Sequence, residues 1–206
     1  MKQFDELLSV IKELNGPKGC PWDKKQTFQS LRPFLLEEVY ELLEAIDARD
    51  IKGMVEEMGD VLFQLLFYAT LGEKEAQFQL EEVIVGLKDK LIRRQPHVFQ
   101  KKEEMSEEKV IELWERVKAE EKKERKHPLE GVPKTLGALP RAQKVLSLLK
   151  RKNMERFKPE GALSEEEALG EKMLRLIESA DEKGIDVESA LRKALKGVEK
   201  RFVTLN

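Results

Sequence analysis

Residues 35–48 read LLEEVYELLEAIDA, and residues 51–71 read IKGMVEEMGDVLFQLLFYATL. In both stretches the apolar residues recur at intervals of three and four, which is the spacing along one side of an α-helix. Only two residues separate the stretches, and the second of them, Asp50, has a side chain that favours the start of a helix. The pair therefore predicts two antiparallel helices joined by a short turn.

The same helical spacing extends over most of the chain, and alternating runs typical of strands are scarce. The first of the two helices is expected to begin near Thr27 or Pro33. Ser164 and Glu167 form a capping-box pattern that marks another helix start. Further helices are expected at residues 4–14, 75–94, 106–118, 141–152, 164–183 and 187–202. We therefore expect an all-α fold, a helical bundle followed by a smaller helical C-terminal region.

Prolines and glycines cluster in residues 128–140, which makes this stretch the best linker candidate. It would separate a helical domain over 1–127 from a second region over 141–206. The two regions share a short similarity, because residues 59–66 can be aligned with residues 170–177. In this alignment Asp60 corresponds to Glu171, but Glu57 falls opposite Ala168. The second region would then lack a complete set of acidic residues.

The composition indicates a folded protein without a dominant charge. Charged residues make up 38% of the chain and hydrophobic residues 40%, yet the formal net charge is only −2. This near balance disfavours nucleic acid and membrane surfaces as partners. The single cysteine, Cys20, is typical of a reducing compartment, and no window approaches the ~20 apolar residues of a membrane span. We expect a cytoplasmic protein.

Acidic residues gather on the two helices expected over residues 35–48 and 51–71. Glu37, Glu38 and Glu41 fall within an arc of about 100° on the first helix, and a solvated helix face explains these three equally well. The second helix is apolar nearly all round after Asp60, so we expect it to be buried. A carboxylate entering such a helix needs a cation or hydrogen-bond donors. Glu57, one turn earlier, points nearly the same way.

If the two helices are neighbours, acids spaced three residues apart face each other across the bundle. Several anions held so close would repel one another strongly, and a hard divalent cation would relieve the repulsion. A ligand set of carboxylates without His or Cys favours Mg²⁺, with Mn²⁺ as a substitute, over Zn²⁺.

The order Glu37-Glu38-x-x-Glu41, fifteen intervening residues and Glu57-x-x-Asp60 resembles the signature of the MazG-type nucleoside triphosphate pyrophosphohydrolases. The likeness covers about residues 3–118. It includes GCPWDKKQT at 19–27, GDVLFQ at 59–64, and DKLIRR at 89–94 followed by PHVF at 96–99. It implies an all-α enzyme that hydrolyses nucleoside triphosphates to monophosphates and pyrophosphate. It also implies a homodimer or higher homo-oligomer, in which helices of neighbouring chains help to build the sites.

The resemblance also assigns roles residue by residue. It implies that Mg²⁺ is held by Glu38, Glu41, Glu57 and Asp60. It makes Glu37 and Glu38 the candidates that activate water. The residues expected to contact the nucleotide are Lys90, Arg93, Arg94, Trp114 and Lys118. The basic residues are equally typical of a solvated helix end, and Trp114 of a core position, so these alternatives stay open.

Other readings of the sequence remain. Trp22 and Asp23 could close over a base or simply pack against the first helix. The chain could be a regulatory or dimerisation module that binds nucleotides without hydrolysing them, or the basic residues between Lys88 and Lys102 could bind nucleic acid in a salt-dependent way. Longer family members carry a second acidic motif, whereas residues 129–206 are shorter and lack it, so the C-terminal helices are expected to supply dimer contacts.

Overall fold

The computed structural model describes residues 2–100, 103–156 and 161–205 of the chain. All regular elements in these ranges are helices, so the predicted all-α fold is confirmed. The chain forms two compact units, unit 1 over Met1–Lys118 and unit 2 over Ala119–Asn206. Within the described ranges, no helix is both long and apolar enough to cross a lipid bilayer.

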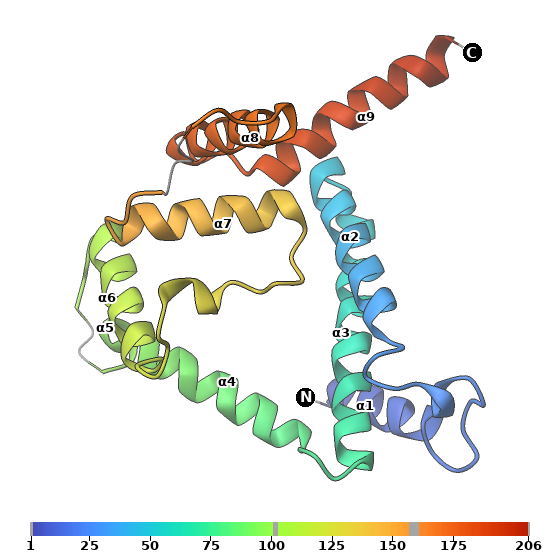
Figure 1. Cartoon of the computed structure of the whole chain (residues 1–206). Coiled ribbons are helices and arrows are strands. Elements are labelled where there is room, and N and C mark those ends of the chain that lie inside the picture. The colour runs from blue at the N-terminus through green and yellow to red at the C-terminus, as the bar shows by residue number, and fades with distance from the viewer. Residues whose placement is uncertain (1, 101–102, 157–160, 206) are drawn as a thin grey trace. The chain divides into compact units, whose positions relative to one another are not determined.

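Unit 1 follows the order that the helical spacing predicts, with small differences at the ends of helices (Figure 1). The helix expected from residue 75 begins at Leu80, because Gln79 and Glu82 form a capping box there. Two short elements were not predicted, the 3-10 helix η1 and the four-residue helix α5. The elements are α1 (Lys2–Leu14), η1 (Asp23–Lys25), α2 (Arg32–Ala48), α3 (Ile51–Lys74), α4 (Leu80–Arg94), α5 (Pro96–Phe99) and α6 (Glu107–Glu120), the last of which continues into unit 2.

Helices α2 and α3 form the antiparallel pair on which the rest of unit 1 is built (Figure 1). The chain reverses at Arg49, which has a left-handed backbone with φ of 56°. Asp50 then caps α3, because its side chain accepts hydrogen bonds of 3.1 Å from the backbone N–H groups of Lys52 and Gly53. The predicted cap is confirmed, and it fixes where α3 begins relative to α2.

The core of unit 1 lies between the beginning of α2 and the C-terminal half of α3. Leu31, Phe67 and Leu71 are almost completely buried and contact one another. Partly buried aromatic side chains surround them: Phe28, Phe34, Phe63 and Tyr68. The Tyr68 hydroxyl donates a 3.1 Å hydrogen bond to the carbonyl of Phe28, which ties the segment before α2 to α3. Helix α1 packs on the same part of α3.

The expectation that α3 is buried nearly all round is wrong for the single chain. Leu62 is 37% exposed and Leu65 is 53% exposed, although buried residues follow both of them on the helix. Helix α4 also exposes apolar side chains, which are Val83, Ile84, Val85, Leu87 and Leu91. Unit 1 therefore exposes many apolar side chains on α3 and α4.

Unit 2 consists of η2 (Pro128–Gly131), α7 (Ala138–Arg151), α8 (Glu165–Glu182) and α9 (Val187–Leu205). The predicted capping box at Ser164 is confirmed, since Ser164 and Glu167 bond to each other's backbone N–H groups. Helix α7 packs on α8 and α9, and Gln143 joins α7 to the start of α9 through hydrogen bonds with Ile185 and Val187. The division between the units falls at residues 118 and 119, before the stretch 128–140 that was expected to be a linker. The predicted domain limits stay a prediction.

Replacing Leu71 with alanine should lower the free energy of unfolding by about 2–5 kcal/mol, because it opens a cavity in the core of unit 1. Leu36 on α2 is the matched control, since it is 56% exposed whereas Leu71 is 1% exposed. Its replacement with alanine should change the free energy by about 0.5 kcal/mol or less. Urea denaturation of both variants measures the difference. Equal losses of stability would contradict the assigned core.

Candidate metal centre

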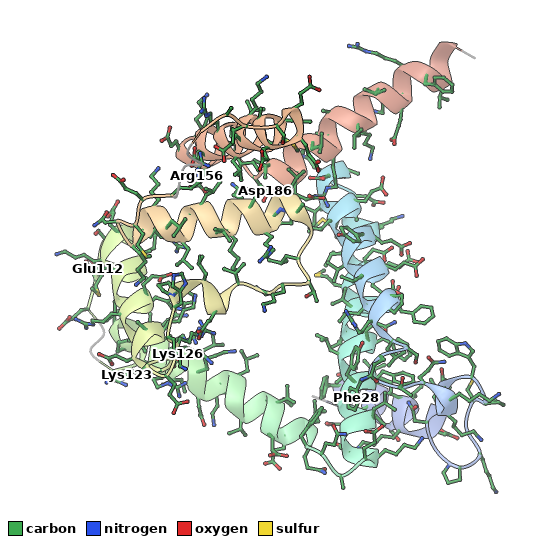
Figure 2. The ribbon with its side chains drawn as sticks, viewed as in Figure 1. Phe28, Glu112, Lys123, Lys126, Arg156 and Asp186 are labelled. Carbon is green, nitrogen blue, oxygen red and sulfur yellow. The ribbon has the colours of Figure 1, made fainter. Side chains whose placement is uncertain are left out.

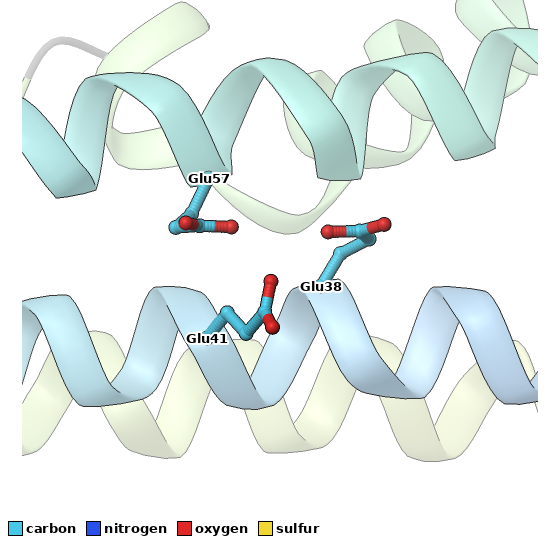
Figure 3. A group of neighbouring side chains, drawn as sticks. All are labelled: Glu38, Glu41 and Glu57. Atoms are coloured by element: carbon cyan, nitrogen blue, oxygen red, sulfur yellow. The ribbon is translucent and has the colours of Figure 1, made fainter.

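Three glutamates from α2 and α3 converge in the space between the two helices (Figure 3). Glu38 and Glu41 come from α2, and Glu57 comes from α3. One carboxylate oxygen of each residue lies within 4.8 Å of one oxygen of each of the others. The structure thus brings together three of the four residues predicted to hold a metal ion.

The turn between the helices explains why these residues meet. Helices that run antiparallel from a tight turn place residues at equal distances from the turn opposite one another. Glu41 lies eight residues before Arg49 and Glu57 lies eight residues after it. Glu38 and Asp60 are likewise eleven residues from Arg49 on either side. The Asp50 cap therefore sets the pairing of the acidic residues.

The convergence of like charges contributes to raised pKa values in the cluster. The pKa of Glu38 is raised, first by loss of hydration and then by the charges of Asp60, Glu41 and Glu37, while a hydrogen bond from Gln64 acts in the opposite direction. The pKa of Glu57 is raised by loss of hydration and by its acidic neighbours, of which Glu41 has the largest effect. The cluster holds more negative charge than its surroundings stabilise.

Glu57 carries a second sign of incomplete pairing. Its Oε2 atom is buried and has no hydrogen-bond partner among the described residues. A buried carboxylate oxygen without a donor is costly unless a cation or another donor reaches it. The site therefore has the chemistry of a cation site, with oxygen ligands only and an unpaired oxygen.

Asp60 and Glu37 lie beside this group and not within it. Asp60 is exposed in the single chain, which corrects the expectation that it enters a buried helix. The expectation failed because the apolar residues that follow Asp60 on α3, including Leu62 and Leu65, are themselves exposed. The charge of Asp60 nevertheless raises the pKa of both Glu38 and Glu57, so it is near enough to act on the cluster. Glu37 is exposed and acts on Glu38 in the same way.

Gln64 was not among the predicted site residues. It is buried one turn beyond Asp60 on α3, and its side chain hydrogen bonds to Glu38. The sequence carried a signal for it, since a glutamine four residues after Asp60 shares its side of the helix and interrupts an apolar run.

A second group forms where α4 ends and α6 passes. The guanidinium of Arg94 lies 5.3 Å from the centre of the Trp114 ring, and the Lys118 ammonium lies 4.5 Å from it. Both distances are typical of cation–π contacts. Trp114 is half-buried, as is Lys90, while Arg93 is exposed. The structure thus joins three of the five residues predicted to contact a nucleotide into a basic and aromatic group.

This second group lies away from the acidic cluster within one chain. Seventeen residues separate Glu57 from Lys74, the end of α3, which amounts to about 25 Å along the helix. Helix α4 joins at that far end and then runs away from α2 and α3 (Figure 1). The predicted metal ligands and the predicted nucleotide contacts are therefore not brought together by a single copy of unit 1.

In unit 2, Glu171 is neutralised by an arginine. Glu171 on α8, which aligns with Asp60, accepts hydrogen bonds of 2.8 and 2.9 Å from Arg156. Arg156 follows α7 (Figure 2) and also donates a 2.8 Å hydrogen bond to Glu178. These contacts raise the pKa of the arginine, so it stays charged. In the part of unit 2 that the structure describes, no three acidic, histidine or cysteine side chains converge as they do in unit 1.

Comparisons with known proteins agree with the position of the cluster. The model of the MazG nucleotide pyrophosphohydrolase domain matches residues 26–99, a range that contains all five acidic residues of the motif. The nucleoside triphosphate pyrophosphohydrolase/pyrophosphatase MazG of Thermotoga maritima is 36% identical over 217 residues, covering 97% of this chain and 84% of that protein.

Two further matches have a narrower extent. The uncharacterized protein YabN of Bacillus subtilis is 49% identical over 144 residues, which cover 69% of this chain and 29% of YabN. A crystal structure of a MazG-related protein from Thermotoga maritima matches 55% of this chain and 97% of that chain, with a TM-score of 0.49 and 30% identity. The match with the Thermotoga pyrophosphohydrolase spans nearly the whole chain and most of that relative, so this chain belongs to the MazG family of nucleotide pyrophosphohydrolases, hydrolases that act on phosphoric anhydrides.

Proposed function

We propose that this chain hydrolyses nucleoside triphosphates to monophosphates and pyrophosphate in a Mg²⁺-dependent reaction with broad base specificity. The observation that carries the proposal is the convergence of Glu38, Glu41 and Glu57, with carboxylate oxygens within 4.8 Å of one another. The matched family domain includes these residues, and the Thermotoga relative is named for the same activity.

The residues of the cluster fit a hard divalent cation. All the candidate donors are carboxylate oxygens, the ligands that Mg²⁺ and Mn²⁺ prefer. The pKa values of Glu38 and Glu57 are raised, and the Oε2 atom of Glu57 has no partner among the described residues. Both features are expected of carboxylates that are placed to bind a positive charge. Glu38, Glu41, Glu57 and Asp60 would hold the ion.

The proposed reaction is attack of water on the α phosphorus. A divalent cation in the cluster would neutralise charge on the phosphates and lower the pKa of water. Glu38, which Gln64 positions, or the adjacent Glu37 accepts a proton from the attacking water. The new oxygen–phosphorus bond forms as the bond from the α phosphorus to the bridging oxygen breaks, and pyrophosphate leaves. Basic side chains offset the charge on the leaving group.

The site is proposed to be completed by a second copy of the chain. The acidic cluster lies between α2 and α3, and the group around Trp114 lies where α4 ends and α6 passes, whereas a triphosphate needs both the cation site and basic contacts. The exposed apolar side chains of α3 and α4 give two copies a surface on which to associate. In such a homodimer, Lys90, Arg93, Arg94, Trp114 and Lys118 of one protomer serve the acidic cluster of its partner.

A second candidate function is binding of nucleotides without hydrolysis. The neutralisation of Glu171 by Arg156 favours this role for unit 2, because a carboxylate held by an arginine is not available to a metal ion. An assay for monophosphate and pyrophosphate across a panel of triphosphates distinguishes the two candidates. Binding without either product would support the non-catalytic role for the whole chain.

Replacing Glu38 or Glu57 with glutamine should reduce pyrophosphate release at least about 100-fold, because each change removes a carboxylate from the proposed cation site. The matched control is Glu56→Gln, an exposed neighbour on the same helix, which should change turnover less than about twofold. Pyrophosphate release and circular dichroism are measured for each variant. Full turnover by both folded cluster variants would disprove the assignment.

Two inactive variants should restore activity when they are mixed. One carries Glu57→Gln and the other carries Arg94→Gln with Lys118→Gln, so a mixed dimer has one site with both groups intact. Free exchange should recover about one quarter of wild-type turnover, since about half of the dimers are mixed and each holds one good site of two. Turnover no greater than the sum of the separate variants would show that each site is built from one chain.

Mg²⁺ should stabilise the protein in a pH-dependent way. Because the pKa values of Glu38 and Glu57 are raised above 4.5, protonation favours the folded state, and their unfavourable contribution disappears as the pH falls from their raised pKa values toward 4.5. The rise in melting temperature caused by Mg²⁺ should shrink over the same interval, since the ion competes with protons. Thermal unfolding between about pH 7 and pH 5 measures this rise. In the Glu38→Gln and Glu57→Gln double variant the rise should be absent, and a persistent one would place the ion elsewhere.

A further inference from the structure

The loop between α1 and α2 presents an exposed tryptophan, Trp22. Trp22 is 51% exposed, although it is among the largest apolar side chains of the protein, while the adjacent Asp23 is buried at 8% exposure. Asp23 is thus packed into the fold, whereas about half of the Trp22 surface is open to solvent. A half-exposed indole ring offers an aromatic face on which a nucleotide base can stack.

The exposure of Trp22 does not result from a loosely held loop. The carbonyl of Trp22 accepts a hydrogen bond of 3.1 Å from the Gln26 side chain and another of 3.1 Å from the backbone N–H of Lys25. Ser30 in turn donates a 2.6 Å hydrogen bond to Gln26. At the other end of the loop, the backbone N–H of Cys20 donates to the carbonyl of Leu14 at 2.9 Å. The backbone at Trp22 is thus fixed on both sides.

The indole ring is braced by one aromatic neighbour. The ring centres of Trp22 and Phe34 are 5.4 Å apart, and the ring planes cross at 76°. Such an edge-to-face contact leaves at least one face of the indole uncovered by Phe34. Phe34 itself packs against the core of unit 1, so the indole ring is supported by that core.

Phe34 places the indole next to the acidic cluster. Phe34 precedes Glu38 by four residues on α2, so the two side chains share one side of the helix and lie about 6 Å apart along its axis. Trp22 therefore contacts Phe34, and Phe34 lies about one helical turn from Glu38. A triphosphate bound at the acidic cluster would hold its attached base within reach of this part of the surface.

We propose that Trp22, supported by Phe34, stacks against the base of the nucleoside triphosphate. The inference rests on the proposed function and adds a base site to it. Stacking on an indole uses the flat face that every base has, so it gives affinity with little discrimination between bases. This chemistry fits an enzyme of broad base specificity, and it assigns the base to the same chain that supplies the acidic cluster.

Intrinsic fluorescence tests the contact directly, because the chain has only two tryptophans, Trp22 and Trp114. In the Trp114→Phe variant all tryptophan emission comes from Trp22. An ATP analogue with a methylene group between the α and β phosphorus atoms should quench this emission in the presence of Mg²⁺, whereas inorganic tripolyphosphate, which has no base, should not. Equal responses to the two ligands, or no response to an analogue whose binding calorimetry detects, would overturn the proposal.

Substitutions separate stacking from a structural effect. Trp22→Leu should raise KM for ATP about tenfold with a much smaller change in kcat, and it should leave binding of tripolyphosphate unchanged. Trp22→Phe retains an aromatic face and should stay within about threefold of wild type. The matched control is Tyr40→Leu, an aromatic residue of similar exposure on α2, which should resemble wild type.

The outcomes are distinguishable from failure of the proposed function. If Trp22→Leu weakens ATP and tripolyphosphate equally, or if Tyr40→Leu has the same effect, the role of Trp22 is structural and the inference is wrong. If wild type releases no pyrophosphate from any triphosphate, the proposed function fails. The fluorescence experiment still decides in that case whether a base lies on Trp22.

Discussion

The repulsion between carboxylates held across α2 and α3 is the constraint on which the candidate site depends. Glu38, Glu41 and Glu57 would separate if their helices were free, and two features prevent this. The turn at Arg49 and the Asp50 cap set the pairing of the helices, and the contacts among Leu31, Phe67 and Leu71 hold the helices together beyond the cluster. The fold thus keeps an unfavourable arrangement of charge in place, which is the state that a divalent cation stabilises.

The arrangement of α2 and α3 could be predicted from the sequence because each part of it is a local property. Helical spacing of apolar residues identifies the two helices, and the two-residue connection requires them to be antiparallel neighbours. Asp50 marks the start of α3, and counting from Arg49 then pairs Glu41 with Glu57. The same reasoning identified the capping box at Ser164. These features are set by residues that are close together in the sequence, so they can be predicted without the structure.

The features that the sequence did not predict depend on contacts between distant segments. Periodicity shows that one side of α3 is apolar, but it does not show whether the same chain covers that side, so Asp60 was wrongly expected to be buried. The direction in which α4 leaves α3 is set by the residues between the helices and not by the basic segment that it carries. The pairing of Arg156 with Glu171 could not be predicted either, because fourteen residues lie between them. The direction of α4 is also the reason why the acidic cluster and the group around Trp114 lie apart in one chain.

The two units differ in how their acidic side chains are paired. In unit 2 an arginine neutralises Glu171, whereas in unit 1 the buried Oε2 atom of Glu57 has no hydrogen-bond partner among the described residues. The most direct measurement is anomalous X-ray scattering from crystals of the full chain grown with Mn²⁺. If the cluster is the cation site, a manganese peak is expected among Glu38, Glu41 and Glu57, and none at Glu171. A peak only at other residues, or well-ordered glutamates with no ion between them at saturating Mn²⁺, would contradict it.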